Sequence, residues 1–251
     1  MSNIERLARQ VAGSQSDALS QCRKLVGWMQ AELEWSVTDY QTRTVDNILA
    51  RRAGNCAEQS RVLTALLTVI GIPSRPIAEI NLQLPWVERG QFAEKMVAER
   101  GPSASVFGTM HNDHRWLEVR DLATGIWHPA DASLGICGDS EWVAARIAFG
   151  ERPAAARDMI VPIMVLVMGS SNQAQDDRTE HYLVDAFQAY LGECGRESRA
   201  FADWCRLVRV LAAGGKRAFA GVQSFLEYAE PMQQALDAYR QIQRDCSKTR
   251  P

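Results

Sequence analysis

The sequence predicts an α+β fold in which a helix with a cysteine at its N-terminus packs on an antiparallel sheet. Apolar residues recur at helical spacing in the first part of the chain, alternate as in strands in the middle, and return to helical spacing at the end. In addition, Cys56, His114 and Asp131 stand at the ends of predicted elements in that order. We therefore expect one α+β domain over residues 1–169, its N-terminal helices included, and a helical extension over residues 170–251.

The N-terminal part is predicted to contain three helices. The first two cover residues 3–12 and 16–34, with Ser16 or Asp17 as the N-cap of the second. An aromatic and β-branched patch then leads into a third helix at about residues 44–52. The buried face of the second helix is predicted from apolar residues at alternating steps of three and four, namely Leu19, Cys22, Val26, Met29 and Leu33.

A central helix is predicted to begin at Cys56. The preceding Gly54 and Asn55 interrupt the third helix, and Gly71 with Pro73 ends the new one. Because its apolar stripe is wide, we expect this helix to be mostly buried. The stripe consists of Val62, Leu63, Leu66, Leu67 and Ile70.

The middle of the chain is predicted to form the sheet. Residues 116–119 and 125–128 read as neighbouring strands joined by a short turn. Two further strands are predicted at residues 75–84 and 159–168. Between the strands at 75–84 and 116–119 lies a long polar segment, about residues 85–112, with a helix predicted at 91–99. A loop of that length is usually functional or disordered, so we expect it to border the site.

The last third of the chain is predicted to be helical after a small, polar boundary at residues 169–175. Three apolar stripes follow, and Gly214 with Gly215 is expected to separate two of the helices. The stripes are Val184, Phe187 and Leu191; Phe201, Trp204, Val208 and Leu211; and Met232, Leu236, Tyr239 and Ile242.

Composition excludes several classes of protein. A net charge of -2 and a pI near 6.1, without a Lys/Arg-rich block, give no reason to expect nucleic acid as a partner. The polar start has no apolar signal region, and the longest apolar run is too short to span a bilayer. We therefore expect a cytoplasmic protein with no membrane partner; the oligomeric state is left open.

The six cysteines are expected to be reduced thiols, most of them packing residues. No C-x-x-C pair occurs, and 251 residues with 46% hydrophobic content can build a core without disulfides. Free cysteine behaves as a small apolar residue, as Cys22 does in its helical stripe.

Cys56, His114 and Asp131 offer a nucleophile, a base and an orienting carboxylate. Unpaired N–H groups at a helix N-terminus favour a thiolate at Cys56 and can bind an oxyanion. A histidine at a strand end can accept the thiol proton and later protonate a leaving group. An aspartate on the next strand can orient that histidine through its other ring nitrogen.

A zinc site is the competing interpretation of the histidines. His111 and His114 have H-x-x-H spacing, and Asp113, His128 and Cys137 lie nearby in sequence. However, the pair lies where a loop enters a strand, and no H-E-x-x-H is present. We expect neither a metal nor a cofactor, with His111 near the mouth of the site and His128 pointing outward.

Together these motifs resemble the core of the transglutaminase-like superfamily. The family pattern is G-x-C, then G-I-P-x-R after a helix, then H-x-W-x-E-V, then W-x-x-x-D. Here it reads Gly54 to Cys56, Gly71 to Arg75, His114 to Val119, and Trp127 to Asp131. The resemblance covers about residues 40–135. It implies a papain-like core in which Cys56 is the nucleophile, His114 the base and Asp131 the orienting residue.

The resemblance also assigns the remaining motif residues. Arg75, Trp116 and Trp127 match positions with structural roles. The family usually places a second oxyanion donor upstream of the cysteine. Trp35 is the first candidate and Tyr40 the second, with core packing as the alternative for both.

The implied function is a cysteine acyltransferase that works through a thioester on Cys56. The donor would be a peptide, an amide or a thioester, free or carrier-bound. We prefer an amine acceptor, as in stand-alone bacterial enzymes of this type, which form amide bonds. The alternatives are a peptidase or amidase with water as acceptor, and a non-catalytic scaffold used for binding.

Overall fold

The computed structural model describes most of the chain and divides it into two compact units. The described residues are 2–13, 17–36, 41–82, 95, 98–99, 113–148, 161–169, 174–219 and 229–247. The first unit comprises Met1–Ala78 and His114–Trp142, and the second comprises Glu79–Asp113 and Val143–Pro251.

Four helices of the first unit begin at capping residues that the sequence supplies. They are α1 Asn3–Ala12, α2 Ala18–Glu32, α3 Val45–Arg51 and α4 Cys56–Val69. Their N-cap side chains accept hydrogen bonds from the first turn of each helix, which satisfies donors that have no partner within the helix. These N-caps are Ser2, Asp17, Thr44 and Asn55. The predicted starts are therefore confirmed to within two residues.

The strands of the first unit belong to two sheets. A short parallel pair joins β1 Glu34–Trp35 to β2 Ala53–Gly54. The larger sheet has the order β6-β5-β4-β3 in this unit, with β4–β5 and β5–β6 antiparallel. Its strands are β3 Ser74–Leu82, β4 Asp113–Arg120, β5 Trp127–Asp131 and β6 Ile136–Cys137. In the register, Leu117 lies opposite Ala130, and Ala130 lies opposite Cys137.

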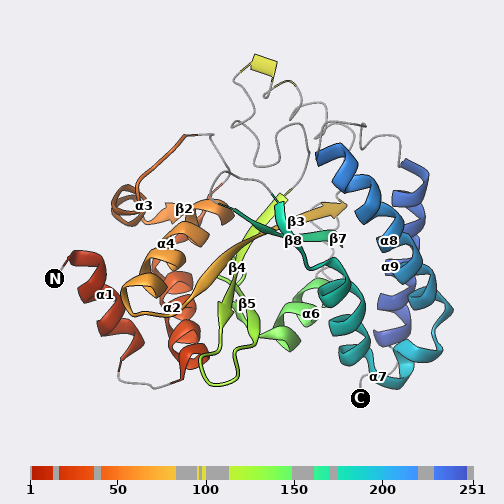
Figure 1. Cartoon of the computed structure of the whole chain (residues 1–251), viewed down its shortest axis with the longest axis horizontal. Helices are drawn as coiled ribbons and strands as arrows, with labels where there is room; N and C mark the ends of the chain where they lie inside the picture. The colour runs from red at the N-terminus through yellow and green to blue at the C-terminus, as the bar shows by residue number, and fades with distance from the viewer. Residues whose placement is uncertain are drawn as a thin grey trace. The chain divides into compact units, whose positions relative to one another are not determined.

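The core of the first unit lies between its helices and the sheet. Helices α2 and α4 lie on one side of β4 and β5 (Figure 1). The predicted stripe of α4 is buried at Val62, Leu63, Leu66 and Leu67. Apolar side chains of β4 and β5 complete the cluster with Leu117, Val119 and Ala130. This packing fixes the helix that begins at the cysteine against the strands that carry the histidine and the aspartate.

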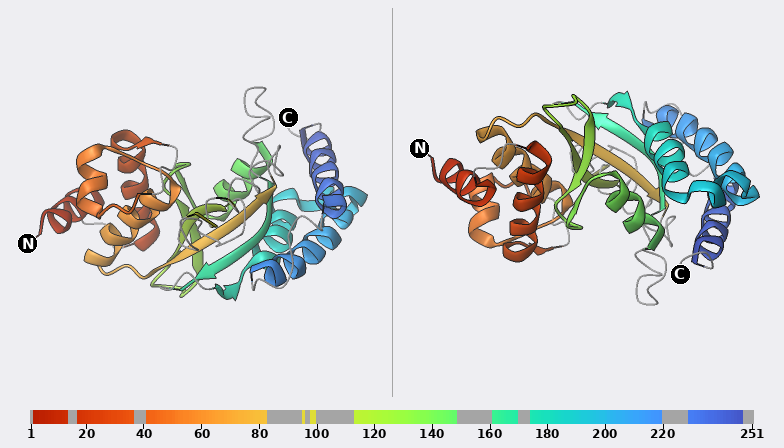
Figure 2. Two further views of the ribbon diagram at one scale, coloured as in Figure 1. Left: turned by 90° about the horizontal axis from the view of Figure 1, so that it is seen from above. Right: turned by 90° about the horizontal axis from the view of Figure 1, so that it is seen from below.

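The second unit combines the end of β3 with two more strands and a group of helices. Strand β3 continues into it and is followed in the sheet order by β7 and β8, which pair antiparallel. Helix α8 packs beside β7, and α9 packs on α8, with α7 in contact with both helices (Figure 2). The elements are the C-terminal part of α6 Asp139–Ala148, β7 Val161–Met168, β8 Ala174–Asp177, the π-helix η4 His181–Ala186, α7 Phe187–Glu197, α8 Arg199–Phe219 and α9 Ala229–Ser247.

The helices of the second unit pack around Trp204. Its indole N–H donates to the Leu183 carbonyl at 2.9 Å, and its ring lies 5.6 Å from Tyr239 and 5.9 Å from Phe187. These three aromatic residues come from the three stripes predicted in the sequence. All eight residues of β7 are buried, as expected for the predicted interior strand.

The α+β class is confirmed, and one prediction about its elements is wrong. Helix α8 continues through Gly214 and Gly215, which do not separate two helices. A glycine inside a helix costs only about 1 kcal/mol, and the buried stripe of α8 offsets that cost. The helix predicted at residues 91–99 lies largely outside the described residues. The boundary after residue 169 stays a prediction, because the two compact units do not test it.

None of the helices that the structure describes is long and apolar enough to cross a bilayer.

Candidate active site

Cys56 is the first residue of α4, and the sequence around it fixes that position. The Asn55 side chain accepts a hydrogen bond from the Glu58 N–H at 3.0 Å, and the Glu58 carboxylate accepts one from the Asn55 N–H at 3.1 Å. This reciprocal pair is a capping box. Because it uses the N–H groups of the N-cap and of the third helical residue, it leaves the Cys56 N–H, at the positive end of the helix, without a partner among the described residues.

The glycine two residues before the cysteine is required by contact. The Gly54 carbonyl accepts hydrogen bonds from the Gln59 side chain at 3.0 Å and from the Ser36 N–H at 3.1 Å. A Cβ atom added at residue 54 would lie 3.0 Å from Glu58 Cβ and 3.3 Å from Ile48 Cγ2. The backbone before Cys56 is therefore held from two sides, and a Cβ atom at residue 54 would be crowded by its neighbours.

An ion pair holds the other side of the Glu58 carboxylate. Arg43 donates to Glu58 at 2.9 Å, and the two side chains are only 14% and 2% exposed. The Arg43 carbonyl also accepts a hydrogen bond from Arg61 of α4 at 3.0 Å. Since Glu58 serves both the capping box and Arg43, the residues before α3 are tied to the start of the helix that carries Cys56.

His114 and Asp131 meet across β4 and β5. The Nε2 atom of His114 lies 2.6 Å from Oδ2 of Asp131, which is completely buried. The other carboxylate oxygen accepts hydrogen bonds from the Ser133 N–H at 3.2 Å and the Ser133 hydroxyl at 2.8 Å. Both oxygens of Asp131 therefore have partners, and the carboxylate holds the imidazole ring in one orientation.

Cys56 is the second partner of the His114 ring. Cys56 is close enough to His114 to raise its pKa, and because Nε2 faces Asp131, Nδ1 is the ring nitrogen left for the thiol. Burial of the ring lowers the pKa of His114, but the charge and hydrogen bond of Asp131, together with Cys56, outweigh burial and raise the pKa well above its ordinary value. The site therefore favours a protonated imidazole beside the cysteine, the form that can deliver a proton to a leaving group.

The other motif residues form the structural support of this pair. The Arg75 guanidinium lies 2.6 Å from the buried Glu118 carboxylate and 4.5 Å above the Trp127 ring. Trp116 is fully buried, 5.6 Å from Trp142. These contacts link β3, β4 and β5, which agrees with the structural roles expected for these residues.

Of the three candidate oxyanion and substrate residues, only Trp35 lies in the described part of the chain. Trp35 lies on β1 directly opposite Gly54, and it is 60% exposed, so it is not a core packing residue. Tyr40 and His111 lie outside the described residues, and their predicted roles stay predictions.

Two of the histidines considered for zinc have other contacts. Nδ1 of His128 lies 2.6 Å from Asp139 Oδ2, and His114 faces Asp131. In the described part of the chain, no three His, Cys, Asp or Glu side chains gather as a metal site would require.

Four residues that support the site were not predicted from the sequence, namely Arg43, Glu58, Gln59 and Ser133. The N-x-x-E spacing of Asn55 and Glu58 is a readable capping-box signal. Ser133, two residues after Asp131, has the spacing of a side-chain to backbone turn bond, which is a weaker signal. Nothing in the sequence pattern indicates that Gln59 reaches back to Gly54.

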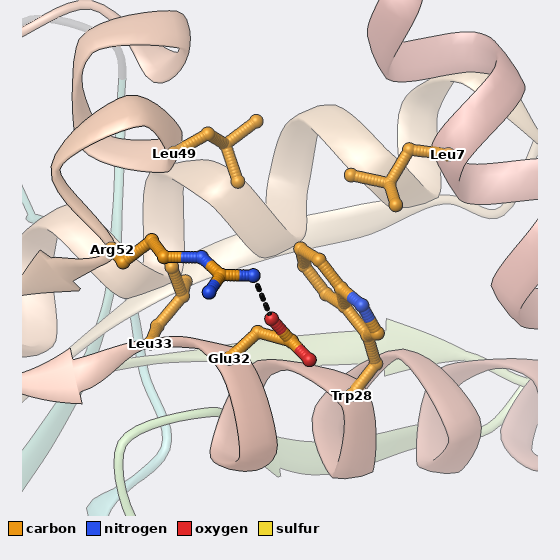
Figure 3. A pocket seen from close by; sticks show the side chains of 6 residues that line it. All are labelled: Leu7, Trp28, Glu32, Leu33, Leu49 and Arg52. Carbon is orange, nitrogen blue, oxygen red and sulfur yellow. Dashed lines mark hydrogen bonds and ion pairs between the residues drawn. The ribbon is translucent and has the colours of Figure 1, made fainter.

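A separate pocket lies between α1, α2 and α3 (Figure 3). Its volume is about 160 Å³, and an ion pair between Glu32 and Arg52 lies beside the Trp28 indole. The lining residues are Leu7, Trp28, Glu32, Leu33, Leu49 and Arg52. None of the three predicted catalytic residues lines this pocket.

Comparison with known proteins gives the family. The model of the transglutaminase-like superfamily matches residues 5–132, a region that contains Cys56, His114 and Asp131. The chain belongs to the transglutaminase-like superfamily. The resemblance drawn from the motifs is confirmed, and membership supports a cysteine-based catalytic domain.

Two further comparisons add little to the superfamily assignment. No curated protein matches the chain. Among solved structures, the chain is similar to one from Cytophaga hutchinsonii that is named a "Putative Cysteine Protease", with 16% identity and a TM-score of 0.39. That likeness covers 64% of this chain and 41% of the other, so the chain spans about two fifths of that protein's length.

Proposed function

We propose that this superfamily member is a cysteine acyltransferase that forms a thioester on Cys56 and passes the acyl group to an amine. The observation that carries the proposal is the placement of His114, which contacts Cys56 on one side and Asp131 on the other. A nucleophile, a base and an orienting group in contact are the requirement for acyl transfer through a covalent intermediate.

In the first step the Cys56 sulfur attacks the carbonyl carbon of the donor. The C–S bond forms, and the carbonyl oxygen becomes an oxyanion that the Cys56 N–H binds at the helix start. We assign Trp35 as the second oxyanion donor, because β1 holds it opposite Gly54, two residues before the nucleophile. His114 then gives its proton to the leaving group, and the thioester remains.

In the second step an amine attacks the thioester. His114 accepts a proton from the amine, the C–S bond breaks, and the thiolate of Cys56 is restored as the amide leaves. Water can follow the same route and gives a free acid instead. The acceptor is therefore decided by which nucleophile the site holds in line with the thioester.

Limited access to the base supports an amine acceptor. His114 and Asp131 are buried, whereas Cys56 is partly exposed. An acceptor must therefore approach along the cysteine side, where the exposed Trp35 indole offers an apolar face. An acceptor bound there can outcompete water at about 55 M, because effective molarities for well-oriented reactants reach about 10⁵ M or more. The donor is a peptide, an amide or a thioester, free or carrier-bound.

The test is to load the protein with an activated acyl donor and follow the mass of the intact chain. Wild-type protein should gain the mass of the acyl group, and Cys56→Ala should not. The isolated acyl-enzyme should then persist in buffer and discharge much faster with a suitable amine from a panel of amines and amino acids.

Two other results of this experiment would each indicate a different function. Rapid decay in buffer, unchanged by every amine, identifies a hydrolase. Failure of the wild-type protein to accept any acyl group, while correctly folded, identifies a non-catalytic scaffold.

A further inference from the structure

Two cysteines outside the active site form a buried pair in the first unit. Cys22 lies on α2 and Cys137 on β6, and their exposed fractions are 0% and 1%. The Cys137 sulfur lies 3.7 Å from the Leu19 carbonyl oxygen, one helical turn before Cys22 on the same face of α2. Each thiol also shifts the pKa of the other. The Cys137 sulfur therefore lies beside the turn of α2 that carries Cys22.

The backbone of Cys137 is held in place over α2. Its carbonyl accepts a hydrogen bond from Arg23 at 2.6 Å, and its N–H donates to Glu141 at 2.9 Å. Arg23 and Glu141 also form an ion pair with each other. Because both peptide groups of Cys137 are occupied, the strand does not carry its sulfur away from Cys22 without breaking these bonds.

The two thiols differ in acidity. The hydrogen bond to Cys137 and burial raise the pKa of Cys22 well above its ordinary value. The hydrogen bond from Cys22 lowers the pKa of Cys137, burial opposes this effect, and the Arg23 guanidinium adds to it, so the pKa of Cys137 is lowered. This difference makes Cys137 the thiol of the pair that reacts first.

We propose that Cys22 and Cys137 are a redox pair that a small peroxide converts into a disulfide between α2 and β6. The Cys137 thiolate attacks one oxygen of hydrogen peroxide, the O–O bond breaks, and a sulfenic acid and hydroxide form. The Cys22 sulfur then attacks the sulfenic sulfur, the S–S bond forms, and the departing hydroxide takes the Cys22 proton as water. In sum, two thiols and one peroxide give one disulfide and two waters.

The disulfide would change stability by constraining the unfolded chain. It closes a long loop, and the stabilisation by a cross-link grows with the length of the loop. It also ties α2 to the strand whose partner carries the site, since Cys137 lies opposite Ala130 and Ile136 opposite Asp131. The oxidised protein should therefore unfold at a higher temperature than the reduced protein.

The experiment treats the full chain with hydrogen peroxide, alkylates remaining thiols in denaturant, and maps the peptides. We expect one cross-linked species joining the Cys22 and Cys137 peptides, about 2 Da lighter than the reduced pair. Dithiothreitol should reverse the cross-link. The thermal midpoint of oxidised wild-type protein should exceed that of reduced protein. Cys22→Ser should lose this difference, and Cys205→Ser, a matched change at another buried cysteine, should keep it.

The mapping on wild-type protein decides the proposal even if Cys22→Ser fails to fold. Recovery of Cys22 and Cys137 as separate alkylated or over-oxidised residues, after Cys56 has been fully oxidised, would overturn it. A disulfide that joins either cysteine to a different partner would overturn it as well.

Discussion

At the scale of single residues, the proposed chemistry depends on which nitrogen of His114 faces which partner. With Nε2 bound to Asp131, Nδ1 serves Cys56. Asp131→Asn should leave the fold intact and lower turnover by orders of magnitude, on the order of 10⁴ in the analogous serine triad. Turnover of a folded variant, checked by circular dichroism, measures this effect.

Asp121→Asn is the matched control for that substitution. Asp121 is also an aspartate of the β4–β5 region, but its carboxylate bonds to the Ala123 N–H and the Thr124 hydroxyl. We expect the activity of the Asp121→Asn variant to remain near that of wild type. If Asp121→Asn abolished turnover while Asp131→Asn did not, the orienting role would pass to Asp121.

The raised pKa of His114 predicts the direction of a pH profile. The imidazole is protonated below that pKa, and a protonated imidazole is needed to release the leaving group. The acylation rate should therefore fall as pH rises through a value well above about 6.5, the ordinary histidine pKa. In Asp131→Asn, burial remains but the carboxylate is gone, so the fall should move to lower pH. Single-turnover acylation followed by mass at a series of pH values tests this, and an unmoved profile would contradict it.

The same pKa shift acts on stability. Because the folded pKa of His114 lies above the unfolded one, its interactions stabilise the fold fully below about pH 6.5. This contribution is lost as pH rises through the raised pKa. Asp131→Asn should therefore lose more stability at mildly acidic than at alkaline pH, as urea unfolding would show.

Reactivity toward an alkylating agent tests the position of Cys56 directly. Cys56 is a partly exposed residue at a helix N-terminus, whereas Cys22, Cys137 and Cys205 are buried. Because thiolate character and access control the rate, iodoacetamide at neutral pH should modify Cys56 before the other cysteines. Peptide mapping at short times gives the order, and Cys56 among the slowest would count against its role.

At the scale of helices and strands, the capping box is the feature that joins stability to the site. Asn55→Ala removes the acceptor of the Glu58 N–H and should cost about 1 kcal/mol of stability. It should also lower activity by more than the loss of folded protein explains, because the direction of the Cys56 N–H depends on the same turn. Thr44→Ala, which removes the equivalent N-cap of α3, is the control: similar destabilisation with near-normal activity is expected.

The elements that the sequence predicted well are those with strong local signals. The starts of α1 to α4 follow from capping residues, and β4 and β5 follow from their alternation around a short turn. The short strand β6 and the helix α6 were missed, because two residues cannot show a period and α6 has only a mixed apolar face. The continuation of α8 through Gly214 was missed since tertiary packing overrides a local helix-breaking preference.

The residues of the candidate site also divide into those that local sequence motifs predict and those that they do not. Cys56, His114 and Asp131 could be predicted because each lies in a motif with a fixed place on its element. Arg43 could not, because its partner Glu58 is fifteen residues away in sequence, and no periodicity links the two. Such long-range polar contacts depend on the packing of whole elements.

At the scale of the whole molecule, the boundary predicted after residue 169 can be tested by truncation. In the second unit, β7 pairs with β8, and its side chains are fully buried. A fragment of residues 1–169 would lose β8 and the helices that contact β7, and would expose a strand of eight apolar or near-apolar residues. We expect the fragment to be poorly soluble or much less stable than the full chain. Expression with circular dichroism measures this, and a folded, active fragment would show that the extension is dispensable.

The crowding at Gly54 has a consequence for what selection can accept there. The residue does not have a positive φ, so backbone conformation alone would admit alanine. A Cβ atom would instead be crowded by Glu58 Cβ and Ile48 Cγ2. A library that randomises residue 54 and selects for acylation should therefore return glycine almost exclusively. A library that also varies residue 48 to smaller side chains removes the Ile48 contact and leaves the Glu58 contact in place. Alanine at residue 54 in that library would show that the neighbouring helices, rather than the turn itself, set the first letter of the G-x-C motif.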